Sequence, residues 1–134
     1  MTDLYSEELL EEVRRRMGIV EIYFKNYQEY LDRREFEKAS EMLWGILNNL
    51  ASMLSMLYGG EPIRKHDELR MFMNVLAQRI REPEILRLYR SCEKLHANFF
   101  HSFMDEIDFE ECRIDAEKLI DILQKLVYRE LGNI

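Results

Sequence analysis

Histidine, arginine and acidic side chains are the groups in this sequence that could carry out chemistry. Only three histidines occur, His66, His96 and His101, so few arrangements can pair a nucleophile with an imidazole base. The sequence contains no Gly-rich phosphate-binding loop and no CxxC metal or redox motif. Most classes of enzyme therefore lose support, and the spacing of the three histidines is the main chemical signal.

The spacing of the histidines gives little support to a metal centre. A helical bundle can hold two metal ions with carboxylates and two Glu-x-x-His elements, and the sequence has one such element, from Glu93 to His96. His96 and His101 are five residues apart and would point in different directions on a helix. We therefore predict no metal site, and no cofactor.

Two groups of arginines are candidates for binding an anion. Residues 14–16 are all arginine, but consecutive residues fan out around a helix, and glutamates lie three or four positions earlier. Such spacing favours a solvated face of ion pairs, with a binding surface as the alternative. The second group is Arg79, Arg81, Arg87 and Arg90, which is either a binding surface or simply faces solvent.

Composition indicates one folded domain. The chain has 134 residues, of which 47% are hydrophobic and 34% are charged, so residues 1–134 can bury one sizeable core. The net charge is −7 and the sequence pI is about 5.1. The overall field repels nucleic acid, so any RNA contact would need a local basic patch.

The sequence predicts a cytoplasmic protein without a membrane segment. Polar residues interrupt its longest apolar stretch, residues 42–58, and acids occupy the first twelve residues where a secretory signal would be basic and then apolar. Cys92 and Cys112 lie far apart within helical patterns, which favours buried thiols over a disulfide.

The candidate residues lie in a predicted all-α fold, an antiparallel up-and-down bundle of about five helices. Apolar residues recur at alternating spacings of three and four, which is typical of amphipathic helices. Capping boxes are predicted at Asp32 with Glu35 and at Asp108 with Glu111, and a cap at Asp67. The predicted helices cover residues 6–31, 32–58, 67–79, 83–104 and 108–132.

The second predicted helix is apolar around most of its circumference. Such a helix is either the central one of its bundle or uses the additional apolar face in a subunit contact. Its remaining row, Gly45, Asn48, Ser52 and Ser55, is small and polar, which permits another part of the chain to approach closely.

Three segments of the sequence resemble one archaeal family. The first segment, residues 95–100, is LHANFF and is followed by an acidic turn at residues 105–108. The second, residues 39–45, is ASEMLWG. In the third, Leu69 follows His66 by three positions. These segments are similar to the Leu-His-Ala-Asn-Phe-Tyr signature, the Ala-rich Trp-Gly helix and the His-x-x-Leu loop of the PaREP family. The resemblance extends over most of the chain from Phe36 onward.

The PaREP family in turn resembles the HEPN superfamily of helical, usually dimeric proteins. Many of these are metal-independent ribonucleases or nucleotide binders with an Arg-x(4–6)-His motif, and Arg90 with His96 fits it. The resemblance implies that His96 is the catalytic base for a ribose 2′-hydroxyl and that Arg90 holds the phosphate. Asn98, His66 and His101 are expected to contribute to ligand binding.

The resemblance also implies partners. It predicts an HEPN-like homodimer that binds RNA or a nucleotide, with a nucleotidyltransferase-like antitoxin as a further partner. On a straight helix Arg90 and His96 are about a third of a turn from alignment. A joint site would therefore require a kink or a second copy of the chain.

Two other functions fit the same residues. His96 lies beside Cys92 and Leu95 on the apolar side of its predicted helix, where a buried histidine bonded to a polar neighbour is common. The chain would then be a non-catalytic, dimeric interaction protein, which the acidic net charge favours. A bundle that binds a small ligand is the third hypothesis.

Overall fold

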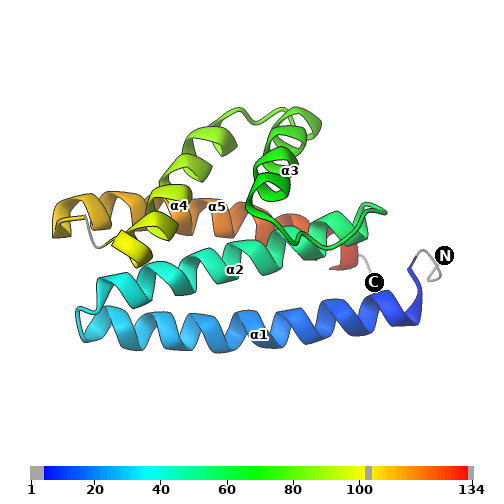
Figure 1. Ribbon diagram of the computed structural model, residues 1–134. Helices are drawn as coiled ribbons and strands as arrows, with labels where there is room; N and C mark the ends of the chain where they lie inside the picture. Colours follow the sequence, from blue (N-terminus) through cyan, green and yellow to red (C-terminus); the bar gives the residue numbers. More distant parts are fainter. Residues whose placement is uncertain (1–4, 102–103, 133–134) are drawn as a thin grey trace.

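Five α-helices make up the computed structural model, which describes residues 5–101 and 104–132 (Figure 1). The described residues contain no strand, so the predicted all-α fold is confirmed. The predicted helix bounds agree with the observed ones to within about one turn. The helices are α1 (Glu7–Asp32), α2 (Phe36–Leu57), α3 (His66–Arg79), α4 (Glu84–His101) and α5 (Glu106–Gly132).

Helix α2 lies at the centre of the bundle and contacts each of the other four helices. Leu47 and Met53, which point about 120° apart around α2, and Ile46 between them are all completely buried. Burying one such side chain contributes about 1.5–3 kcal/mol, so α2 supplies a large part of the hydrophobic stabilisation. Its apolar circumference is covered within one chain, which confirms the central position and requires no subunit contact.

The helices do not alternate in direction along the chain. Figure 1 shows α1 and α2 as an antiparallel hairpin, while α5 runs beside α2 in the same direction. Phe36 at the start of α2 stacks on Phe109 near the start of α5, with 4.7 Å between ring centroids. In a regular up-and-down bundle, α2 and α5 would run in opposite directions. The chain departs from it because α3 and α4 lie on the side of α2 away from α1 and return the chain to the start of α2 (Figure 1).

The turn between α1 and α2 differs from the predicted capping box. Helix α1 continues through Asp32, and Arg34 takes a positive φ of 59° before α2 begins at Phe36. Asp32 is therefore the last residue of one helix rather than the cap of the next. Glu35 occupies the cap position of α2 without a side-chain capping bond.

Helix α5 also begins earlier than the predicted box. Its cap is Asp105, whose Oδ1 accepts the backbone N–H of Asp108 at 2.8 Å. Asp108 lies inside the first turn, where a negative charge complements the helix dipole. The aspartate three residues upstream was the better cap because it precedes Glu106, the first helical residue.

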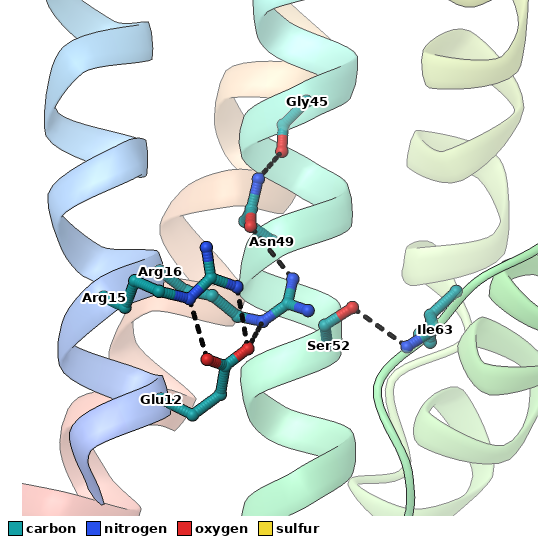
Figure 2. A network of polar contacts seen from close by, with 7 residues as sticks. All are labelled: Glu12, Arg15, Arg16, Gly45, Asn49, Ser52 and Ile63. Carbon is teal, nitrogen blue, oxygen red and sulfur yellow. Dashed lines mark hydrogen bonds and ion pairs between the residues drawn. The ribbon is translucent and has the colours of Figure 1, made fainter. Parts of the chain in front are cut away.

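A polar network joins α1 to α2 (Figure 2). The Glu12 carboxylate accepts hydrogen bonds from Arg15 (2.8 Å) and Arg16 (3.0 Å), and Arg16 also donates to Oδ1 of Asn49 on α2 (3.0 Å). Asn49 in turn donates to the carbonyl oxygen of Gly45 (2.9 Å). Two of the three consecutive arginines are thus ion-paired, as the spacing predicted. The same contacts lower the pKa of Glu12 to about 2, chiefly through the hydrogen bond from Arg15.

Two serines of α2 anchor the segment that leads into α3. The Ser52 Oγ accepts the backbone N–H of Ile63 at 3.0 Å (Figure 2), and the Ser55 Oγ donates to the carbonyl oxygen of Glu61 at 2.6 Å. Two members of the small polar row of α2 therefore hold this loop. Because the loop ends at Lys65, its attachment determines where α3 begins.

The first turn of α3 is capped by Glu68 rather than by the predicted Asp67. The Glu68 Oε1 accepts the backbone N–H groups of Arg64 (2.9 Å) and Lys65 (3.3 Å), whereas Asp67 bonds only to the next residue's N–H. This reaching-back carboxylate places His66 as the first residue of α3. The ring that the sequence singled out is thus positioned by both the loop and the cap.

Both cysteines are buried and free, as predicted. Burial raises the pKa of each thiol, so neither is an activated nucleophile. Across the described part of the chain, none of the helices has the length and apolar character needed to cross a bilayer.

Candidate functional site

Three aromatic rings, one each from α2, α3 and α4, contact one another. The imidazole of His96, on α4, stacks on the indole of Trp44, on α2, with centroids 4.3 Å apart and planes 12° apart. His66, at the start of α3, meets Trp44 edge-on at 5.0 Å and His96 at 5.7 Å, with the two imidazole planes 80° apart. We refer to Trp44, His66 and His96 as the three-ring cluster.

The three rings differ in their exposure. Trp44 is 7% exposed, so the indole is a buried support rather than an open stacking surface. The side chain of His96 is 24% exposed and that of His66 is 44% exposed. The cluster therefore presents two imidazoles to solvent on a rigid aromatic base.

A glutamate binds each imidazole. Nδ1 of His96 lies 3.3 Å from Oε2 of Glu41, and Nε2 of His66 lies 3.0 Å from Oε2 of Glu93. An ionised carboxylate can only accept hydrogen bonds, so the ring nitrogen facing it carries the proton. In the neutral rings this assigns the tautomers, with Nε2 of His96 and Nδ1 of His66 as the nitrogens that carry no proton.

Glu93 is itself held by Arg70 of α3. Nε and Nη2 of Arg70 donate to the same Oε2 atom at 2.9 and 2.7 Å. The carboxylate therefore receives two hydrogen bonds from a guanidinium and one from His66. This interaction links α3 to α4 at the edge of the cluster.

Burial affects two further groups around the cluster. It raises the pKa of Glu41, while the hydrogen bond to His96 acts in the opposite direction. The ring of Tyr89 lies 6.1 Å from Trp44, and burial, together with the nearby charge of Glu93, raises the pKa of its hydroxyl. Tyr89 therefore stays neutral, whereas the partly buried Glu41 is placed to stabilise a positive charge on His96.

A family model that covers most of the chain matches these elements. The model of the archaeal PaREP1/PaREP8 family matches residues 15–120. The chain belongs to this family. No curated protein and no solved structure matches it.

The matched range contains the whole three-ring cluster. Each of the three segments that resemble the PaREP family contributes one ring, namely Trp44 from residues 39–45, His66 from residues 66–69 at the start of α3, and His96 from residues 95–100. Segments that are far apart in the sequence of this PaREP1/PaREP8 member therefore converge on one place in the fold.

The structure places Arg90 on a different face of α4 from His96. Arg90 is exposed and, with Arg87 and Lys94, lines a hollow of about 490 Å³ between α4 and α5. Asp115 on the opposite wall accepts a hydrogen bond from Arg87 at 3.1 Å. His96 instead faces α2, so the two predicted catalytic residues do not meet within one chain, as their spacing of six residues indicated.

Asn98 lies apart from the cluster. It is 2% exposed, and its Oδ1 accepts the backbone N–H of Met104 at 2.9 Å. The residue thus stabilises the chain after α4. His101, the other predicted ligand-binding residue of this helix, ends α4, and its side chain lies outside the described residues.

Sequence reasoning missed the acidic and basic partners of the cluster. Glu41 lies one turn before Trp44 on α2, which is a signal that the two share a face. The sequence pairs Glu93 with His96 as half of a metal-binding element, whereas in the structure Glu93 bonds to His66 on the neighbouring helix. Within residues 5–101 and 104–132, no three metal-ligating side chains come together. The arrangement is instead suited to proton transfer by imidazoles.

Proposed function

We propose that this PaREP1/PaREP8 family member is an HEPN-like, cytoplasmic RNA-binding protein with metal-independent ribonuclease activity, in which His96 is the base. The observation that supports this is the three-ring cluster, in which a solvent-accessible imidazole is stacked on a buried indole and oriented by a carboxylate. A positioned imidazole contributes about 10²–10⁴-fold to a reaction that requires proton transfer.

The chemistry follows from the orientation of His96. With the proton on Nδ1 held by Glu41, Nε2 is the basic nitrogen and can take the proton of a ribose 2′-hydroxyl. The imidazolium that forms is then stabilised by the Glu41 carboxylate, 3.3 Å away. Attack of the 2′-oxygen on the adjacent phosphorus cleaves RNA and requires no water nucleophile.

Arg90 enters this proposal through a second copy of the chain. Because Arg90 and His96 lie on different faces of α4, Arg90 can serve as the phosphate clamp only for the His96 of another subunit. We therefore propose a homodimer with composite sites. A nucleotidyltransferase-like protein is the proposed antitoxin partner of such a nuclease.

The test is cleavage of a 5′-labelled single-stranded RNA in the presence of EDTA. The wild type is expected to yield a product ending in a 2′,3′-cyclic phosphate, and 2′-O-methyl RNA should resist it. His96→Gln should lose at least about 100-fold in rate, because glutamine fills similar space but cannot shuttle a proton. Arg14→Ala, which removes one positive charge from an exposed position of α1, is the charge-matched control for Arg90→Ala.

Subunit mixing tests the composite site. If Arg90 acts across the dimer, inactive Arg90→Ala and His96→Gln subunits should regain activity when mixed, because a mixed dimer contains one intact site. Wild-type protein that cleaves no RNA under any of these conditions would refute the ribonuclease proposal.

A second candidate is a non-catalytic, dimeric interaction protein. It is favoured by the stacking of His96 on Trp44 and by the use of Asn98 in the backbone structure after α4, since both residues then serve packing. The net charge of −7 also disfavours a polyanionic substrate. A dimer by mass measurement in solution that neither binds nor cleaves RNA would favour this function.

A further inference from the structure

The three-ring cluster holds a second imidazole that the proposed function does not use. His66 comes from α3 rather than α4, and its ring centroid lies 5.7 Å from that of His96. Both rings are partly exposed, and a glutamate binds each of them. Two oriented imidazoles at this separation can act on two oxygens of one bound phosphodiester, since each hydrogen bond spans about 2.8 Å.

We propose that His66 is the general acid of the same reaction, so that a complete acid–base pair lies within one chain. This inference depends on the proposed ribonuclease function, which assigns the role of base to His96. The substrate class is an RNA phosphodiester whose 5′-oxygen is the leaving group. An alkoxide is a poor leaving group, so protonating it as it departs is the second requirement of the cleavage step.

The step is balanced in atoms and charge. Nε2 of His96 takes the proton of the 2′-hydroxyl, the bond between the 2′-oxygen and phosphorus forms, and the bond between phosphorus and the 5′-oxygen breaks. Nδ1 of His66 gives its proton to the departing 5′-oxygen. The products are a 2′,3′-cyclic phosphate and a 5′-hydroxyl, and proton exchange with solvent returns both imidazoles to their starting forms.

The hydrogen bond between His66 and Glu93 fixes the orientation of the imidazole, as a proton donor in this reaction requires. Oε2 of Glu93 accepts Nε2 of His66 at 3.0 Å and two N–H groups of Arg70 at 2.9 and 2.7 Å. The carboxylate is therefore fixed in place before it orients the imidazole. Glu93 and Arg70 are positioning residues in this scheme.

The cluster also explains why His66 and His96 come from different helices. On one helix, side chains reach the same place only at spacings of three or four residues. Here the loop bound by Ser52 and Ser55 brings the start of α3 to the side of α4 that carries His96. The fold thus supplies from α3 the second functional group that α4 alone does not place beside His96.

A substrate with an altered leaving group separates an acid from a packing residue. The probe is the cleaved RNA oligonucleotide with sulfur in place of the 5′-bridging oxygen at the cleaved position. A thiolate leaves without being protonated, since a thiol has a pKa of about 8.5. We compare wild type, His66→Ala, His66→Gln and His96→Gln on both the oxygen and the sulfur substrate, in EDTA.

His66→Ala and His66→Gln are expected to lose at least about 100-fold on the oxygen substrate and to approach the wild-type rate on the sulfur substrate. His96→Gln should lose activity on both. The His66 variants are their own folding controls, because an unfolded protein cleaves neither substrate, and folding of His96→Gln is checked by circular dichroism. Equal losses on the two substrates, or no loss on either, in the His66 variants would overturn the role of His66 while leaving the proposed function intact. A wild type that cleaves neither substrate would overturn both.

Discussion

Replacing Gly45 by alanine tests how closely α1 and α2 approach each other. A Cβ atom at Gly45 would lie 2.7 Å from Cε2 and 3.0 Å from Cδ2 of Tyr23 on α1, well inside the 3.5–4.0 Å at which carbon atoms attract each other. Overpacking of this kind costs about 1–3 kcal/mol. Alanine also gains about 0.5–1 kcal/mol over glycine in a helix, so we expect a net loss of about 0–2.5 kcal/mol in the free energy of unfolding.

Gly18→Ala provides a matched control. A Cβ atom at Gly18, on the exposed side of α1, would meet nothing within 4 Å, so this variant should be more stable by about 0.5–1 kcal/mol. A Tyr23→Ala background removes the ring that a new methyl group at position 45 would meet. In that background Gly45→Ala should become stabilising, as at position 18.

Urea unfolding monitored by circular dichroism measures all of these variants, with m-values compared to verify two-state behaviour. The double-mutant cycle gives the coupling between positions 23 and 45. If Gly45→Ala stabilised the wild-type chain as much as Gly18→Ala does, the Tyr23 ring would have to move away at no cost. Close packing of α1 on α2 at this point would then be refuted.

Two further predictions concern polar contacts outside the three-ring cluster. Asn98→Ala removes the acceptor of the Met104 N–H and should lower the free energy of unfolding, measured in urea, by about 1–2 kcal/mol. Among folded molecules the affinity for RNA should not change. A loss of RNA affinity without a loss of stability would instead make Asn98 a ligand-binding residue. Arg15 and Arg16 lower the pKa of Glu12 to about 2. Because these ion pairs are exposed, they should contribute at most about 1 kcal/mol to the free energy of unfolding above pH 4.5. This contribution should disappear as the pH falls toward 2 and Glu12 becomes protonated. Glu12→Gln should therefore flatten the acid limb of stability against pH, and an unchanged limb would contradict the pairing.

The helices were predictable because their apolar residues repeat with the helical period. The apolar circumference of α2 was consistent with either a central position or a subunit contact, and the packing of the other helices around it shows the central position. The helix ends were less predictable, since several nearby acids can serve as caps. Asp105 and Asp108 both precede helical residues, and the cap is whichever one packing leaves at the boundary. The order of helix directions was not predictable from periodicity either, because it depends on how α3 and α4 pack on one side of α2.

The candidate site was predictable in its residue types but not in its pairs. His66 and His96 were both singled out, yet nothing in a pattern of single-helix spacings indicates that they meet. Their contact depends on Ser52 and Ser55, which bind the loop before α3 and so bring His66 to α4. Helical periodicity cannot predict contacts between residues of different helices when a connecting loop determines how those helices are placed.

The positions of Arg90 and His66 have different consequences for oligomeric state. A site that uses Arg90 with His96 requires two chains, because α4 directs these side chains to different neighbours. A site that uses His66 with His96 is complete in one chain, because α3 and α4 pack together and the two rings already touch. Dilution should therefore abolish a contribution from Arg90 but not one from His66. If both act, the dimer adds phosphate binding to an acid–base pair that each subunit already possesses, and dimerisation would control substrate binding more than the chemical step.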